Sequence, residues 1–272
     1  MMISKRFKTK MSVTFVISGM LLSAIMLSGG VAHAKGASDK DCSNVPTYSD
    51  LKAALTTARN DPSNNGGFDL DMWGTIVNRD GFVCAVAFTG ADRGSQWPGS
   101  RVISAQKANT ANAFSLTGLS LSTANLWAAV QPGGSLFGLQ HSNPVDTEEA
   151  YGGSSFKFGT SKDPLVGGKI GGVNVFGGGL AMYNSSGVLV GALGVSGDTS
   201  CADHNIAWRT RHTLNMDYVP SGVGADATRA DNINYQGLVA VPSVANDFSH
   251  PICKIGGVDG VSAISLALPV TQ

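Results

Sequence analysis

The sequence predicts an α+β domain, an antiparallel sheet flanked by helices. Two strand-like pairs indicate the sheet, because a turn signal joins the runs of each pair: Asn78-Arg79-Asp80-Gly81 in the first and Asn184-Ser185-Ser186-Gly187 in the second. Segments of helical periodicity lie before, between and after these hairpins. Since an amphipathic helix must bury its apolar stripe, we expect the helices to pack on the sheet.

The first helix and first hairpin follow each other along the chain. Thr47-Tyr48-Ser49-Asp50 matches a capping box, in which the Asp50 carboxylate reaches back to the helix start. Apolar residues at helical spacing follow over 51–58, and the glycine-containing run 61–67 ends the helix. Residues 70–77 and 82–88 are then the predicted strands of the first hairpin.

The middle of the chain alternates helices with glycine-rich loops. A second helix is predicted over 101–115, and a short third helix runs from Ser122 or Thr123 to Val130. Residues 131–146 and 151–172 are rich in loop signals, so we treat 131–172 as an insertion. A short strand is expected at Val173–Phe176.

The second hairpin and the last helix complete the predicted domain, which spans 35–219. Its strands are expected at 180–183 and 188–195. Ser200-Cys201-Ala202-Asp203 matches an S-x-x-D capping box that opens a helix to about Leu214. After Pro220 the periodicity weakens, and we interpret 220–272 as a C-terminal extension that wraps the domain.

Residues 1–34 are predicted to be a secretory signal peptide. The basic start, Met1–Lys10, precedes the apolar run Val13–Leu27, which is too short to span a bilayer comfortably. Ala32-His33-Ala34 matches a cleavage site that leaves Lys35 as the first mature residue. We expect a periplasmic or secreted protein with no membrane span after cleavage; an uncleaved anchor is the alternative.

The mature chain is mildly acidic. The whole sequence holds 19 Lys and Arg against 19 Asp and Glu, and four of the bases lie in the first 34 residues, which contain no acid. The remaining 15 bases and 19 acids leave no basic excess to neutralise phosphates, so nucleic acid is excluded as a partner. A hydrophobic fraction of 43% excludes a disordered chain.

Four cysteines lie in the mature chain, at positions 42, 84, 201 and 253. An even number in an oxidising compartment predicts two disulfides, with three connectivities open. We favour Cys42–Cys84 and Cys201–Cys253, because each pair would fasten a loose end of the chain to its core. No C-x-x-C spacing occurs, which disfavours a redox dithiol or a zinc knuckle.

Several segments resemble the GlcG/HbpS-like haem-binding family. They are Asn78–Gly81 with its flanking strands, Ser104–Ala111 with its K-x-x-T pattern, Gly177–Tyr183, and the glycine-rich strand Gly187–Asp198. The resemblance covers about Thr47 to Leu214. It implies a profilin-like α/β/α sandwich, assembly into homo-oligomers, and binding of haem as cofactor. It also implies haem degradation, or haem or redox sensing through a sensor protein partner.

The resemblance points to a haem site, which needs an apolar slot, an axial ligand and groups for two propionates. The segment Ser135–Pro144 resembles one seen in haem-binding members, so His141 is the expected iron ligand and Asn143 lies in the same loop. Lys107 and Thr110 share one helix face. Lys107 is expected to meet a propionate, and Thr110 to cap the pocket or offer iron a weak oxygen ligand.

Structural alternatives remain open for each of these residues. His141 would then bond the backbone of its loop, Lys107 would be an exposed lysine, and Thr110 would bond a backbone carbonyl. His204 and His212 lie too far apart along one helix, about 12 Å, for a shared small metal ion. A Ser/His/Asp hydrolase is disfavoured because no G-x-S-x-G elbow occurs.

Three functions therefore remain in view. The first is a secreted haem-binding protein that scavenges, senses or degrades haem. The second is an enzyme of another class, which uses the same pocket for a small polar metabolite or cofactor. The third is a non-catalytic oligomeric interaction module. Shared fold does not fix activity, so the sequence leaves open whether the protein is an enzyme.

Overall fold

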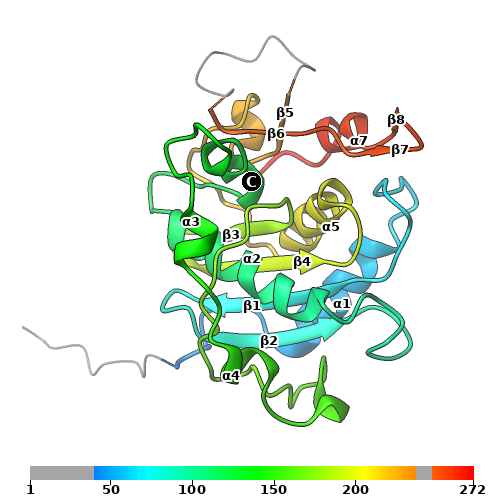
Figure 1. Ribbon diagram of the computed structural model, residues 1–272, viewed down its shortest axis with the longest axis vertical. Coiled ribbons are helices and arrows are strands. Elements are labelled where there is room, and N and C mark those ends of the chain that lie inside the picture. The colour runs from blue at the N-terminus through cyan, green and yellow to red at the C-terminus, as the bar shows by residue number, and fades with distance from the viewer. Residues whose placement is uncertain (1–39, 237–246) are drawn as a thin grey trace, which may run out of the picture. The chain divides into compact units, whose positions relative to one another are not determined.

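The computed structural model describes residues 40–236 and 247–272, so the predicted signal peptide lies outside the described residues. A four-stranded antiparallel sheet with the order β2-β1-β4-β3 forms its centre (Figure 1). The strands are β1 (Trp73–Asn78), β2 (Val83–Phe88), β3 (Gly179–Tyr183) and β4 (Leu189–Ser196). Both predicted hairpins, β1–β2 and β3–β4, are confirmed. The two hairpins join into one sheet because β4 pairs with β1.

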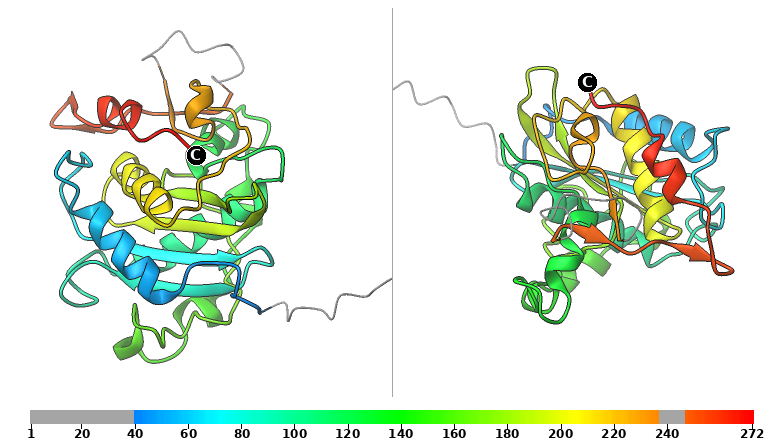
Figure 2. Two further views of the ribbon diagram at one scale, coloured as in Figure 1. Left: turned by 180° about the vertical axis from the view of Figure 1, so that it is seen from behind. Right: turned by 90° about the horizontal axis from the view of Figure 1, so that it is seen from above.

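Helices cover both faces of this sheet. Helices α1 (Tyr48–Arg59) and α5 (Ser200–Thr213) share one core with the sheet, whereas α2 (Ser100–Phe114) packs on the opposite face. Seen from behind, α1 and α5 lie in front of the strands (Figure 2, left). Successive side chains of β4 point to opposite faces of the sheet, which explains the two cores. Leu193 belongs to the core on the α1/α5 side, and Ala192 belongs to the core on the α2 side. The predicted α/β/α layering is therefore confirmed.

Glycine in β4 sets how closely α2 approaches the sheet. A methyl group at Gly194 would lie 2.5 Å from the backbone nitrogen of Ala108 and would overlap the carbonyl oxygen of Ser104. Helix α2 therefore rests directly on the backbone of β4. This contact gives a physical reason for glycine in the apolar strand that most strongly suggested the family.

The insertion 131–172 contains short helices within its loops. They are α3 (Leu139–Ser142), α4 (Thr147–Tyr151) and the 3-10 helix η3 (Ser155–Lys157). The buried guanidinium of Arg101 holds this segment against α2, because its Nε donates to Asp163 Oδ2 at 2.9 Å and its Nη1 to the Ala150 carbonyl at 3.1 Å. The insertion is thus fastened to the sandwich by a bidentate ion pair.

Two local predictions are wrong. Val173–Phe176 forms no strand, because its amides bond to side chains instead of a neighbouring strand: Asn174 N donates to Thr110 Oγ1 at 2.9 Å, and Phe176 N to Asn174 Oδ1 at 3.2 Å. The expected short helix is two 3-10 helices, η1 (Thr123–Leu126) and η2 (Ala128–Val130).

Both disulfides form with the favoured pairing, Cys42–Cys84 and Cys201–Cys253. The second joins α5 to the C-terminal region, whose described part belongs to the same compact unit as the sheet. This region also bonds to α5 through Trp208, whose Nε1 donates to the Pro269 carbonyl at 2.9 Å. Its short elements are η4 (Ala227–Arg229), β5 (Asn234–Tyr235), β6 (Ser249–His250), β7 (Lys254–Ile255), β8 (Val258–Asp259) and α7 (Ser262–Leu266). Across the described residues, no helix combines the length and apolar character that crossing a membrane requires.

Candidate functional site

An apolar cavity of about 560 Å³ lies beside the end of α2, between η1–η2 and the loop that leads to α3. Its lining is almost entirely apolar or small, with Asp247 as the charged member. The lining residues are Phe114, Leu121, Leu126, Ala128, Ala129, Gly133, Gly134, Ser135, Leu136, Asp247 and Phe248. Volume and lining both suit a drug-sized apolar ligand whose polar end reaches solvent.

The wall of this cavity is built by local hydrogen bonds. Leu136 N donates to the Ala129 carbonyl at 2.8 Å, which folds the loop back on η2. Gly138, at a φ of 90°, then turns the chain into α3, a conformation that residues with a side chain rarely adopt. Leu139 follows and packs on the apolar cluster that contains Leu126 and Val130. The loop is therefore anchored at both ends.

His141 presents an open imidazole on α3. Its side chain is exposed and makes no hydrogen bond or ion pair with any described residue. The other described histidines are all engaged: His204 Nε2 meets Asn232 Oδ1 at 3.1 Å, His212 Nδ1 meets Asp217 Oδ2 at 2.6 Å, and His250 Nδ1 meets the Pro251 carbonyl at 2.7 Å. Within the described chain, His141 is thus the exposed histidine that has no hydrogen-bond partner at either ring nitrogen.

Asn143 has a structural role in the same loop. It is the C-cap of α3, and its Nδ2 donates to the Leu139 carbonyl at 2.9 Å and to Ser142 Oγ at 3.0 Å. The amide therefore satisfies a helix-end carbonyl that would otherwise face solvent. Asn143 lies in the same loop as His141, as the sequence predicted, but its side-chain amide donates to α3 and not towards a ligand.

Lys107 and Thr110 are buried, so the alternative of an exposed Lys107 is wrong, whereas the alternative in which Thr110 bonds a backbone carbonyl is confirmed. Lys107 is 1% exposed, and its Nζ donates to Asp203 Oδ2 at 2.7 Å and to the Val195 carbonyl at 3.0 Å. Thr110 Oγ1 donates to the Gln106 carbonyl at 2.7 Å while accepting from Asn174 N. The sheet covers one side of the helix and the 173–176 segment covers another. The polar groups of Lys107 and Thr110 therefore bond to partners within the protein and not to solvent.

Asp203 also departs from its predicted capping role. Thr199 caps α5 instead, since its side chain accepts from Ala202 N, while Asp203 Oδ1 accepts from Gly197 N at 3.0 Å and Asp198 N at 2.8 Å. Burial raises the pKa of Asp203 to about 6, and the Lys107 ammonium opposes this shift. Burial likewise lowers the pKa of Lys107. A carboxyl and an amine with shifted pKa values can exchange protons with a bound molecule.

This ion pair lines a second cavity, of about 280 Å³, distinct from the one beside Leu136. Trp97 and Phe176 flank it and are half-exposed, and its polar lining contains three serines. The full set is Trp97, Ser100, Ile103, Lys107, Phe176, Ser196, Asp198, Ser200 and Asp203. The structure therefore separates Lys107, which lines this second cavity, from the predicted haem loop, whose residues Ser135 and Leu136 line the first. The lining of these two cavities includes none of His141, Asn143 and Thr110.

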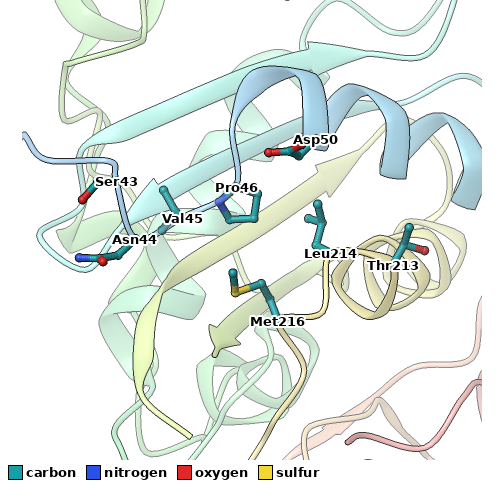
Figure 3. A pocket seen from close by; sticks show the side chains of 8 residues that line it. All are labelled: Ser43, Asn44, Val45, Pro46, Asp50, Thr213, Leu214 and Met216. Carbon is teal, nitrogen blue, oxygen red and sulfur yellow. The ribbon is translucent and has the colours of Figure 1, made fainter. Parts of the chain in front are cut away.

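A third cavity, of about 330 Å³, lies where the N-terminal segment meets the end of α5 (Figure 3). Asp50, Thr213, Leu214 and Met216 line it together with residues 43–46. It holds neither a histidine nor a cation, so it offers no imidazole for iron and no positive partner for an acidic group.

The chain belongs to the HbpS-like family of haem-degrading proteins, whose family model matches residues 47–211. The match spans both hairpins, the three long helices and the loop that carries His141. Residues 212–272 lie beyond it. No curated protein matches the chain.

Three solved structures are similar in fold. A PduOC:heme complex has 21% sequence identity and a TM-score of 0.42, covering 63% of this chain and 96% of its own. Protein ORFY of Klebsiella pneumoniae has 21% identity and a TM-score of 0.40, covering 60% and 87%. HbpS has 14% identity and a TM-score of 0.37, covering 61% and 86%.

Proposed function

We propose that this protein binds haem in the apolar cavity beside α3, with His141 as the axial ligand. The open imidazole of His141, on a helix whose preceding loop lines the cavity, is the observation that carries the proposal. Membership of the HbpS-like family supports haem as the ligand. The cavity offers apolar contact surface, as a porphyrin needs, and the imidazole offers the nitrogen that iron accepts.

The residues present fit haem in part. The apolar lining and the exposed histidine suit haem. Lys107, the cation expected to meet a propionate, is instead buried in an ion pair with Asp203. We therefore propose that the propionates face solvent at the open side of the cavity. Lys107, Thr110 and Asn143 remain predictions as haem contacts, and each has a protein partner in the structure.

Export is part of the proposal. Cleavage before Lys35 would release a periplasmic or secreted chain, and two disulfides suit that compartment. Mass analysis of the exported protein should give Lys35 as the first residue; a retained Met1 would contradict it. Scavenging, sensing through a partner, and haem degradation are then the roles open to an exported haem-binding protein, and self-association should appear as a multimeric mass in light scattering.

A haemin titration with cavity-filling variants tests the site. Haemin should saturate the wild-type protein at one equivalent with a shifted Soret band, and Ala129→Phe should weaken binding because it fills the apolar cavity. Thr213→Phe, which fills the third cavity (Figure 3), is the matched control and should leave binding unchanged. Equal effects of the two variants would remove the cavity from the proposal.

The second cavity favours a second candidate, an enzyme or binding protein for a small polar metabolite. Its observation is the buried Lys107–Asp203 pair beside three serine hydroxyls and two aromatic walls. Native mass spectrometry of the purified protein would detect a retained metabolite, and Ser196→Ala should release it. If neither haem nor a metabolite binds, the non-catalytic interaction module replaces both candidates.

A further inference from the structure

A cluster of two cysteines and a histidine lies outside both candidate ligand cavities described above. The ligand atoms of Cys201, His250 and Cys253 all lie within 4.8 Å of one another. Cys201 and His250 are buried, and Cys253 is partly buried. Among the described residues, this is the group of three or more His, Cys, Asp or Glu side chains placed closely enough to hold one metal ion.

The histidine is oriented towards the sulfurs in the tautomer that a metal requires. His250 Nδ1 lies 2.7 Å from the Pro251 carbonyl, and because a carbonyl only accepts, Nδ1 carries the ring proton. Nε2 is then unprotonated, and it lies 3.3 Å from Ser200 Oγ, which in turn lies 3.4 Å from Cys253 Sγ. A histidine that binds a metal through one ring nitrogen usually donates the N–H of the other nitrogen to a carbonyl, a carboxylate or water.

A disulfide that only fastens the chain needs no such neighbour, and Cys42–Cys84 has none among the described residues. We propose that Cys201, Cys253 and His250 form a redox-gated zinc site, closed while the disulfide is intact and able to bind Zn²⁺ once it is reduced. The inference is independent of haem, because it uses none of the residues around α3.

The spacing of the three groups suits zinc. Bonds of about 2.3 Å to sulfur and 2.0 Å to nitrogen place the ligand atoms of a tetrahedral site roughly 3.5–4 Å apart. The histidine already lies within 4.8 Å of both sulfurs, and the two sulfurs, bonded to each other in the disulfide, would move apart to this spacing after reduction. Two thiolates and an imidazole prefer zinc over the hard cations Mg²⁺ and Ca²⁺. Three protein ligands would leave a fourth position for water. Ser200, which lies beside Cys253, also lines the second cavity.

The reaction needs a dithiol reductant. The dithiol gives two electrons and two protons to the Cys201–Cys253 bond and is itself converted to a disulfide, which leaves two thiols on the protein. Zn²⁺ then forms two bonds to sulfur and one to His250 Nε2. The two thiol protons pass to solvent, and the ring proton stays on Nδ1.

Cobalt is a direct probe, because Co²⁺ bound to thiolates absorbs light by charge transfer. The Cys42→Ser/Cys84→Ser variant of the mature chain leaves Cys201–Cys253 as its disulfide. After reduction by dithiothreitol and anaerobic removal of the reductant, it should bind one Co²⁺ with a thiolate band that Zn²⁺ abolishes. The oxidised protein should show no band. The fluorescence of Trp127, whose ring centre lies 6.1 Å from that of His250, should change on binding.

Two histidine variants separate this site from others. His250→Ala should weaken Co²⁺ and Zn²⁺ binding at least tenfold, whereas His212→Ala, at the end of α5, should not. Equal affinity in His250→Ala, or no thiolate band in the reduced protein, would overturn the proposal. Circular dichroism monitors the fold, and a reduced chain that unfolds and does not refold with Zn²⁺ would also overturn it.

Discussion

Lys107 on α2 and Asp203 on α5 form a buried ion pair, 2.7 Å from Nζ to Oδ2, between helices that cover opposite faces of the sheet. The pair lies at the C-terminal end of β4, where Lys107 also bonds the Val195 carbonyl and Asp203 bonds the amides of Gly197 and Asp198. One ion pair therefore fixes both helices to the same strand end and shapes the second cavity.

Loss of the Lys107 charge should destabilise the fold strongly. In Lys107→Met the Asp203 carboxylate stays buried without its cation, and breaking a buried pair on one side costs about 3–5 kcal/mol. Urea unfolding measures the change in the free energy of unfolding. Lys162→Met, at an exposed position, is the control and should change it by less than about 0.5 kcal/mol. Similar values for the two variants would contradict the role of the pair.

Acid should weaken the fold through His204. Its ring is fully buried, which lowers its pKa from 6.5 to about 3. Between these two pH values the unfolded state binds a proton that the folded state does not. The free energy of unfolding is therefore fully retained above pH 6.5 and decreases as the pH falls from 6.5 towards 3. The slope is about 1.4 kcal/mol per pH unit. Urea unfolding at pH 7, 6 and 5 should show a smaller loss in His204→Gln than in the wild type; equal slopes would exclude His204 as the cause.

Removal of either disulfide should cost similar stability. The two bonds close loops of 42 and 52 residues, and a disulfide typically contributes about 2–4 kcal/mol by restricting the unfolded chain. Cys42→Ser/Cys84→Ser should therefore lower the free energy of unfolding by about that amount. Thiol titration of the native wild-type protein should find no reactive thiol, and four would refute the pairing.

Release of the insertion is expected when Arg101 is replaced. Its guanidinium pairs with Asp163 and stacks 3.6 Å from the centre of the Phe158 ring. Arg101→Met should thus increase protease cleavage within 146–166, while cleavage elsewhere stays slow. The control is Arg229→Met, since Arg229 bonds to Asp226 and to the Leu268 carbonyl in the C-terminal region. Equal cleavage patterns in the two variants would show that the ion pair does not hold the insertion.

The sequence predicted the sheet and the long helices because their signals are local. Turn residues at Gly81 and Gly187 and the periodicity of α1 act within a few residues of the elements they define. Burial of Lys107 could not be predicted in this way, since its partner lies 96 residues away. A usable signal was present, however: the alanines Ala105, Ala108 and Ala111 surround Lys107 on α2, and small residues at helical spacing indicate close packing.

The candidate site was predicted only where its residues are neighbours in the sequence. His141 and Asn143 lie together because they are two residues apart, at the end of α3 and at its C-cap. The cavity beside them depends on Phe114 and Phe248, which come from distant parts of the chain. The Cys201–His250–Cys253 cluster likewise requires the C-terminal region to fold back on α5, and only the disulfide pairing pointed to this contact.

Iron ligation by His141 is tested most directly by a haemin titration of His141→Ala against His212→Ala, followed by the Soret band. We predict that haemin saturates the His212→Ala protein at one equivalent, as in the wild type. In His141→Ala the band should shift and the affinity fall at least tenfold. Unchanged spectrum and affinity in His141→Ala would contradict the ligand assignment, and failure of the wild type to saturate would contradict haem binding itself.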